Sequence, residues 1–270
     1  MGHRVMAAAA RPRSFSTARG RVSGCGCVRD PDPFTVPAPR GRSQSRSLTA
    51  REAVIASRDD TLAHIEQYVA EDATLTSARR AGQQAEIGPI SAASGAALRF
   101  LAAAIGARAV VEVGTGCGSS GIWLLRGMRH DGILTSVDVE PEYQESAREA
   151  YRNAGFPANR ARLIQGSALE VLPRLTDSAY DLVFVDAMRA EYPRFLTEAM
   201  RLLRTGGVVV FNHALDATPL SDGPLSASDP ATAAVREVGQ LIRDDDTLMP
   251  LLLPVGEGLL AAIVSPTTAG

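Results

Sequence analysis

The sequence of 270 residues contains no lysine, so all 28 of its basic residues are arginines. An arginine side chain stays protonated in proteins and therefore cannot act as a general base. The absence of lysine also excludes Schiff-base chemistry through a lysine amine. The composition therefore excludes lysine as a general base or nucleophile in this protein.

Cysteines and long apolar runs are also scarce. The chain has three cysteines, and Cys25 and Cys27 lack the second pair that a zinc site would need. The apolar run at residues 6–10 is too short for the core of a secretory signal or for a membrane span. These features favour a reducing, cytoplasmic setting and no membrane partner.

The first part of the chain differs in composition from the rest. Residues 1–50 hold nine arginines but only two acids, Asp30 and Asp32, and they are rich in serine and proline. Such a segment suits a nucleic-acid-binding tail, a transit peptide or a disordered extension. Nucleic-acid binding is disfavoured because no aromatic residues are interleaved with the arginines. We expect a disordered basic head at residues 1–48, in part the result of a start codon assigned too far upstream, and one folded domain at 49–270.

The most informative motif joins a glycine-rich turn to a later aspartate. The apolar run 109–111 leads into Glu112 and then into glycines at positions 114, 116 and 118. A helical pattern follows, and a second apolar run, 133–137, ends at Asp138. This order of strand, glycine turn, helix, strand and acid is typical of the nucleoside-binding half of an α/β sheet. The glycines let the backbone approach a ligand, and the acid can accept hydrogen bonds from both hydroxyls of a ribose.

Two kinds of cofactor fit this motif. The spacing Gly116-x-Gly118-x-x-Gly121 matches a dinucleotide fingerprint and would indicate an NAD-dependent oxidoreductase. In a dinucleotide fold, however, the first fingerprint glycine closes the strand directly, whereas two further residues intervene here. Glu112 at the mouth of the turn would also repel a pyrophosphate and would suit a cationic ligand. S-adenosylmethionine carries a sulfonium, an amino group and a ribose diol, so Glu112 and Asp138 favour it.

Four motifs in the same order resemble the class I S-adenosylmethionine-dependent O-methyltransferases. The resemblance is to the branch of the catechol and caffeoyl-CoA O-methyltransferases, and within it to a small actinobacterial subgroup. It covers residues 86–264, and its motifs lie at residues 111–116, 137–142, 180–186 and 202–207. The arginine- and alanine-rich composition also indicates a bacterial genome rich in G and C.

The resemblance implies an α/β protein with the Rossmann-like class I methyltransferase fold. We expect a mostly parallel seven-stranded sheet with an antiparallel C-terminal strand, helices on both faces and extra N-terminal helices. The hydrophobic pattern predicts strands at residues 109–113, 133–138, 161–165, 181–186, 207–212, 248–253 and 259–264. It predicts core helices at residues 119–129, 141–154, 167–175, 190–203 and 231–244, preceded by helices at 51–70, 71–85 and 92–105. The segment Gly256-Glu257-Gly258 is short enough to join the last two strands as a hairpin.

The resemblance also implies which residues bind the cofactor. Glu112 is expected near the sulfonium or the amino-acid end of the cofactor, Ser120 at its carboxylate, and Asp138 at its ribose. The other expected contacts are Ile90 against the cofactor, Gly114, Thr115 and Gly116 beneath it, and Ser167 and Ala168 at the adenine edge. Ser167 is equally consistent with an ordinary helix cap.

The chain departs from its relatives on the acceptor side. Asp186 occupies the place of a metal-binding aspartate, but the Asp-Asn pair of the metal-dependent branch is replaced by Asn212-His213. One carboxylate, one amide and one imidazole suit a hard cation poorly, because magnesium prefers several charged oxygens. The family's catalytic lysine is replaced by Arg189. We therefore predict catalysis without a metal ion, with His213 as the general base and Asp186 orienting either the acceptor hydroxyl or His213. A histidine that only anchors the following loop is an equally good interpretation.

The sequence thus predicts an S-adenosylmethionine-dependent O-methyltransferase that acts on a hydroxyl of a small acceptor, an aromatic one by the resemblance. Two alternatives remain open: a non-catalytic, cofactor-binding dimeric protein, which the altered metal motif would explain, and the NAD-dependent oxidoreductase. In the family the N-terminal helices cover the cofactor and often contribute to a dimer. The expected partners are therefore a small-molecule acceptor and a second copy of the chain, without nucleic acid.

Overall fold

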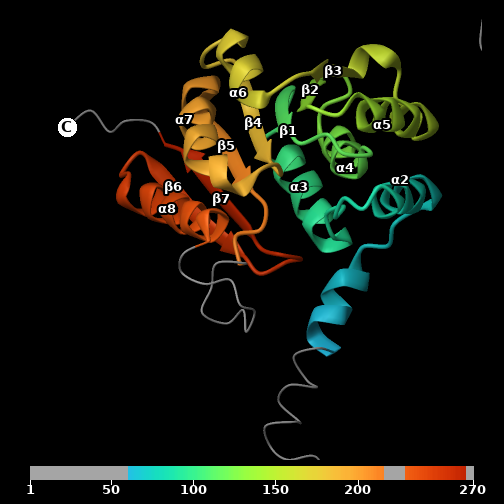
Figure 1. Ribbon diagram of the computed structural model, residues 1–270, viewed down its shortest axis with the longest axis horizontal. Helices are drawn as coiled ribbons and strands as arrows, with labels where there is room; N and C mark the ends of the chain where they lie inside the picture. Colours follow the sequence, from blue (N-terminus) through green and yellow to red (C-terminus); the bar gives the residue numbers. More distant parts are fainter. Residues whose placement is uncertain (1–59, 216–228, 266–270) are drawn as a thin grey trace, which may run out of the picture. The chain divides into compact units, whose positions relative to one another are not determined.

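The computed structural model describes residues 60–215 and 229–265. The head predicted at residues 1–48 and the first part of the helix predicted at 51–70 lie outside these ranges. At the centre of the described part is one seven-stranded sheet with the strand order β3-β2-β1-β4-β5-β7-β6 (Figure 1). Its strands are β1 (Ala109–Val113), β2 (Ile133–Asp138), β3 (Ala161–Gln165), β4 (Tyr180–Val185), β5 (Leu203–Phe211), β6 (Leu248–Leu253) and β7 (Leu259–Val264).

The direction of the strands matches the fold expected from the sequence. Neighbouring strands from β3 to β5 pair in parallel, whereas β7 runs antiparallel to both β5 and β6. The last two strands form the expected hairpin, which turns at residues 254–258. The predicted mostly parallel sheet with an antiparallel C-terminal strand is confirmed.

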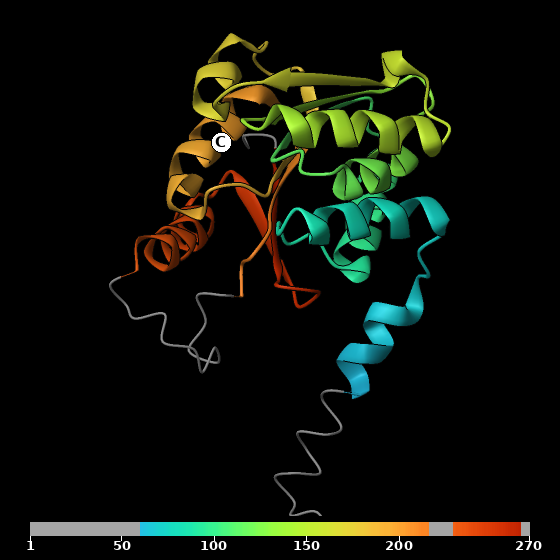
Figure 2. The same cartoon turned by 45° about the vertical axis from the view of Figure 1, so that its right-hand side comes forward.

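Helices cover both faces of the sheet (Figure 2). On one face lie α2 (Ala73–Gln84), α3 (Ala92–Ala104), α4 (Ser119–Gly127) and α5 (Pro141–Asn153), and on the other lie α6 (Ala168–Val171), α7 (Tyr192–Leu202) and α8 (Pro230–Asp244). Residues 60–68 form a further helix before α2. The first core contains Leu98, Trp123 and Phe184, and the second contains Phe195 and Phe211. Each face of the sheet therefore buries its own apolar layer.

Several element boundaries differ from the sequence prediction, and three of the differences have a clear physical reason. Strand β5 begins at Leu203 rather than at residue 207, because its first residues pair with Tyr180 before the register shifts. The helix predicted at 167–175 ends as α6 at Val171 and continues as a 3-10 turn, Leu172–Arg174, whose Pro173 has no N–H for an α-helical bond. Likewise, α7 begins at Tyr192 and follows a 3-10 turn, Arg189–Glu191.

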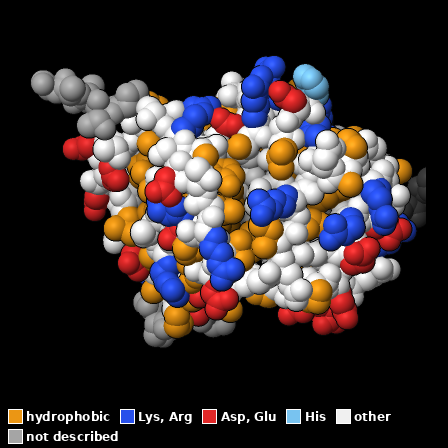
Figure 3. Space-filling model, turned by 90° about the horizontal axis from the view of Figure 1, so that it is seen from above, with side chains coloured by type: hydrophobic (Ala, Val, Ile, Leu, Met, Phe, Trp, Pro, Cys, Tyr) orange, Lys and Arg blue, Asp and Glu red, His pale blue; other side chains and the backbone are white. Residues whose placement is uncertain are grey.

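The surfaces of the described residues carry mixed charge. In the view of Figure 3, arginine and acidic side chains are interspersed with apolar ones and are not gathered by sign. A continuous basic surface of the kind that binds nucleic acid is therefore not found on this face of the described residues. Within residues 60–215 and 229–265, no helix has the length and apolar character that crossing a membrane requires.

The glycine turn after β1 fixes the position of the site. The carboxyl ends of β1, β2, β4 and β5 meet at one edge of the sheet, where open α/β sheets bind ligands. Gly114 has a φ of 95°, and a Cβ at this position would lie 2.1 Å from the backbone oxygen of Asp186. Only glycine fits here, so the turn after β1 packs directly against the end of β4.

Candidate functional site

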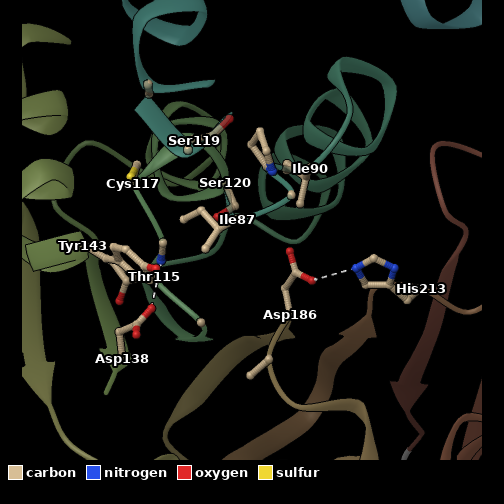
Figure 4. A pocket seen from close by; sticks show the side chains of 17 residues that line it. Ile87, Ile90, Thr115, Cys117, Ser119, Ser120, Asp138, Tyr143, Asp186 and His213 are labelled. Carbon is tan, nitrogen blue, oxygen red and sulfur yellow. Dashed lines mark hydrogen bonds and ion pairs between the residues drawn. The ribbon is translucent and has the colours of Figure 1, made fainter. Parts of the chain in front are cut away.

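A cavity of about 290 Å³ lies at this edge of the sheet. Its walls come from α2, the segment between α2 and α3, the glycine turn, and the ends of β2, β4 and β5. In Figure 4, Asp138, Thr115 and Tyr143 lie on one side of the pocket and Asp186 and His213 on the other. The predicted site residues in its lining are Ile90, Gly114, Thr115, Gly116, Ser120, Asp138, Asp186 and His213.

A second cavity, of about 270 Å³, adjoins the first. Both are lined by Gly114, Asp138 and Asp186, so they form one elongated cleft across the sheet edge. The second cavity also includes two further predicted contacts, Ser167 and Ala168. Ser167 is the N-cap residue of α6, but its side chain makes no capping hydrogen bond to the helix.

Asp138 is anchored by the backbone on both sides. Its Oδ2 accepts a hydrogen bond from Gly116 N at 2.9 Å, and its Oδ1 accepts one from Glu140 N at 3.0 Å. A carboxylate has about four lone-pair sites, so two bonds leave both oxygens able to accept further donors. The glycine turn therefore holds the Asp138 carboxylate in a fixed orientation at the wall of the cleft.

Glu112 is placed differently from the expectation. It is fully buried and lines neither cavity, because the pleat of β1 turns its side chain toward α4 and β2 and not toward the mouth of the turn. Its two oxygens accept hydrogen bonds from Ser120 Oγ and Ser136 Oγ, both at 2.6 Å. Burial raises the pKa of the Glu112 carboxyl to about 7, although the two serine bonds oppose the rise. Ser136 also lies 2.7 Å from Thr115 Oγ1, which links Glu112 to the glycine turn.

The beginning of α4 offers donors that the sequence analysis missed. The N-cap residue Gly118 has no side chain to cap the helix, and the neighbouring Ser119 is buried in the cavity wall. Ser119 Oγ has no hydrogen-bond partner among the described residues. Free backbone N–H groups at a helix start, together with such a hydroxyl, suit an anionic group. The signal was present in the sequence, since Ser119 directly follows the last glycine of the turn.

Asp186 and His213 form the other wall of the cleft. Asp186 Oδ1 accepts a hydrogen bond from Asn212 Nδ2 at 3.1 Å and lies 3.6 Å from His213 Nε2. Burial raises the pKa of Asp186, whereas the His213 charge and the bond from Asn212 act to lower it. Tyr192 fixes the same loop, because its hydroxyl donates to the backbone oxygen of Asn212 at 3.1 Å. The imidazole is thus held beside a carboxylate at the edge of the cavity.

His213 has an unusual backbone conformation. Its φ of 59° lies in the left-handed region, which non-glycine residues seldom adopt. Such strain persists only where the surrounding structure enforces it, and it is concentrated at functional sites. Here the next two residues are fixed, because Ala214 N and Leu215 N donate to the backbone oxygens of Gly258 and Glu257 at 3.0 and 2.9 Å. The backbone therefore aims the His213 side chain at Asp186.

The sequence model of a protein family described as O-methyltransferase matches residues 62–263. The chain belongs to this family. A protein of Mycolicibacterium vanbaalenii, provisionally named an O-methyltransferase, is 52% identical over 199 residues, which are 74% of this chain and 87% of that protein. The family membership confirms the resemblance inferred from the four sequence motifs.

Two solved structures of O-methyltransferases share the fold and contain a cofactor. TomG from Streptomyces achromogenes, an O-methyltransferase involved in tomaymycin synthesis and solved with S-adenosylmethionine, has a TM-score of 0.66 and 28% identity. The match covers 81% of this chain and 100% of that chain. The O-methyltransferase from Bacillus cereus, solved with S-adenosylhomocysteine, has a TM-score of 0.68 and 25% identity over 76% of this chain and 99% of that chain. These matches favour the methyltransferase interpretation of the glycine turn over the dinucleotide one.

The residues beside Asp186 do not fit a divalent metal ion. Among the described residues at this position Asp186 provides a single carboxylate, and Asn212 faces it with the amide nitrogen, a donor, while Asn212 Oδ1 is buried without a described partner. In the same described ranges no group of three or more His, Cys, Asp or Glu side chains converges on one point. A hard cation needs several charged oxygens, and the described side chains at this position, one carboxylate, one amide and one imidazole, do not provide them.

Proposed function

We propose that the protein transfers the methyl group of S-adenosylmethionine to a hydroxyl of a small, aromatic acceptor. The observation that carries this proposal is one cleft with Asp138 on one wall and the Asp186–His213 pair on the other. Incubation with S-adenosylmethionine and a panel of catechols and monophenols should yield S-adenosylhomocysteine and a product heavier by one methylene. Absence of turnover despite cofactor binding would favour the non-catalytic alternative.

The cofactor is proposed to lie along the whole cleft. Asp138 would bind the ribose, and the second cavity would hold the adenine. The Ser119 hydroxyl and the backbone N–H of Ser120 at the start of α4 would bind the carboxylate, because the Ser120 hydroxyl already donates to Glu112. The residues that line the two cavities support this placement: Ile90 would lie above the cofactor, Gly114, Thr115 and Gly116 beneath it, and Ser167 and Ala168 at the adenine edge. Glu112 would act from behind this wall through Ser120 and Thr115. When bound, the cofactor supplies an already activated methyl group.

Asp138→Ala should weaken cofactor binding by roughly 10- to 150-fold, because a charged acceptor for a diol contributes about 1.5–3 kcal/mol. Calorimetric titration with S-adenosylhomocysteine measures this change. Asp138 also holds the glycine turn through Gly116 N, so Asp138→Asn is the matched control, since it keeps the shape and one accepting oxygen. Unchanged affinity in a folded Asp138→Ala protein would remove the ribose role.

We propose that the acceptor is deprotonated by His213. Methyl transfer needs the attacking oxygen, the methyl carbon and the sulfur to be aligned, and needs water to be excluded. The acceptor oxygen would lose its proton to the imidazole as it forms the new bond to carbon, while the sulfur takes the electrons of the bond that breaks. Asp186 then orients either the imidazole or the acceptor hydroxyl. Both roles are compatible with the 3.6 Å between Asp186 Oδ1 and His213 Nε2.

Turnover should survive the removal of divalent metals. The reason is that the carboxylate, amide and imidazole at this position would bind such an ion weakly, in competition with protons on the imidazole. The measurement compares initial rates before and after dialysis against EDTA. Loss of activity on EDTA treatment and its return with magnesium would show a working metal centre and would contradict the proposed base.

Two further proposals concern the state of the protein. A homodimer is supported by two exposed aromatic side chains: Tyr68 is 79% exposed and Phe100 on α3 is 71% exposed. A nearby apolar hollow is lined by His64, Tyr68, Ala96 and Val255 among others.

A cytoplasmic location is supported by Cys117, which is buried as a free thiol in the cavity wall, as expected of a reducing compartment.

A further inference from the structure

The cavity is closed on one side by a short segment between two helices. Residues 87–90, here called the roof segment, follow α2 and precede α3, and all four line the cavity. The neighbouring positions Ala78 and Gly82 on α2 line it as well. In Figure 4, Ile87 and Ile90 point into the space between the Asp138 side and the Asp186 side. A ligand in this cavity would therefore lie against the roof segment.

Arg79 on α2 binds the backbone of the roof segment. Its Nη1 donates to the backbone oxygen of Ile90 at 2.6 Å. Its Nε and Nη2 donate to the two carboxylate oxygens of Glu71, so the guanidinium is held in one plane. The side chains of Arg79 and Glu71 are only 20% and 13% exposed, which limits screening by solvent. Glu71 thus fixes the orientation of the Arg79 guanidinium, and the remaining nitrogen, Nη1, binds the roof segment.

Glu66 binds the chain directly after the roof segment. It lies on the helix at residues 60–68 and accepts hydrogen bonds from Ser91 Oγ at 2.9 Å and from Ala93 N at 3.1 Å. Its carboxylate therefore sits at the beginning of α3, where the helix dipole favours negative charge. It also accepts a bond from Gly256 N in the β6–β7 hairpin at 3.2 Å. One carboxylate thereby joins the N-terminal helix, the start of α3 and the hairpin.

The β6–β7 hairpin also contacts the segment that follows His213 on the acceptor side of the cleft. The backbone oxygens of its next two residues, Glu257 and Gly258, accept hydrogen bonds from the two residues that follow His213. Gly256 also packs tightly, because a Cβ on it would lie 2.6 Å from Ser94 Oγ. Glu66 is therefore connected to the end of the roof segment and, through the hairpin backbone, to the wall of the cleft that carries His213, although it lines neither cavity.

We propose that Arg79 and Glu66 are positioning residues that hold the roof segment against the bound cofactor. This inference rests on the proposed function, because it takes the ligand of the cavity to be the cofactor. Neither side chain touches the cofactor. They act on it through Ile90 and Ser91 and set how tightly it binds and how fast S-adenosylhomocysteine leaves. The alternative is that the Arg79–Glu71 ion pair only stabilises α2. In that case the hydrogen bond from Arg79 to Ile90 would have no effect on cofactor binding.

The test separates the ion pair from the contact to the roof segment. Arg79→Met and Glu71→Gln both remove the ion pair, and only Arg79→Met removes the bond to Ile90. Arg80→Gln, at the next and exposed position of α2, is the control for a loss of charge. Calorimetry with S-adenosylhomocysteine gives the affinity, and displacement of labelled cofactor gives the dissociation rate. Thermal unfolding of each variant without cofactor gives its stability.

We expect Arg79→Met to weaken the binding of S-adenosylhomocysteine about tenfold and to speed its dissociation, as the loss of a charged hydrogen bond implies. Glu71→Gln should lower thermal stability by as much as Arg79→Met but should change affinity clearly less. Glu66→Gln is nearly isosteric, so its fold is retained, and it should weaken affinity in the same way. In Arg79→Met and Glu66→Gln the KM for S-adenosylmethionine should rise while kcat does not fall.

Equal losses of affinity in Arg79→Met and Glu71→Gln would overturn the proposal, and so would unchanged affinity in both Arg79→Met and Glu66→Gln. A fall in kcat without a change in affinity would overturn it as well. These outcomes require that the unaltered protein binds S-adenosylhomocysteine. If it does not, the proposed function itself fails, and the two failures are therefore distinguishable.

Discussion

Replacing His213 with alanine is expected to lower the turnover rate by roughly 10²- to 10⁴-fold, the contribution of a positioned general base. Cofactor affinity should remain nearly unchanged, because His213 lies on the acceptor wall, across the cleft from Asp138. Arg189, which follows Asp186 by three residues, stays protonated and cannot take over the proton. Rates are measured as release of S-adenosylhomocysteine with a phenol that the unaltered protein methylates.

The backbone of His213 requires a second variant. Alanine disfavours the left-handed conformation found here, with its φ of 59°, and a rate loss could therefore arise from a displaced loop. Asparagine adopts this conformation readily and cannot act as a base at neutral pH. If His213→Asn is as inactive as His213→Ala, the imidazole itself is required. Activity retained in His213→Asn would show that the residue only anchors the loop.

The fold was predictable to the extent that it depends on local pattern. The bounds of β1, β2 and β3 match the prediction because each strand ends at a local signal, a following glycine for β1 and β3 and an acid for β2. The start of β5 was wrong because it depends on pairing with Tyr180 across a register shift, and such pairing has no local signal. The proline that ends α6 was visible in the sequence, at residue 173, and could have shortened the predicted helix.

The candidate site was predictable where it follows from sheet topology. Asp138 is the last residue of β2, Asp186 directly follows β4, and His213 comes just after the end of β5. Parallel strands bring these carboxyl ends to one edge of the sheet. The direction of Glu112 was not predictable in the same way, because its partner Ser136 lies on the adjacent strand. The contacts of Glu66 and Arg79 were missed for a similar reason: they join helices to a segment and a hairpin that are distant in sequence.

The buried carboxyl of Glu112 should make the stability of the protein depend on pH. Its pKa is about 7 in the folded protein, compared with an ordinary value of 4.5. The folded state therefore binds the proton more tightly than the unfolded state does. The stabilising contribution of the protonated form is complete below pH 4.5 and is lost as the pH rises through about 7. Asp186 and Asp138 add to this effect, because their negative charges raise the pKa of Glu112 further.

Glu112→Gln should remove this dependence, because glutamine keeps the shape of the side chain and never ionises. Relative to the variant, the unaltered protein should lose roughly 2–3 kcal/mol of unfolding free energy between pH 5 and pH 8, since each pKa unit corresponds to about 1.4 kcal/mol. Urea unfolding of both proteins across this range measures the difference, in which the titration of all other groups largely cancels. A constant difference from pH 5 to pH 8 would mean that Glu112 is already ionised at the lower pH. In that case the two serine hydroxyls, and not a bound proton, would compensate for its burial.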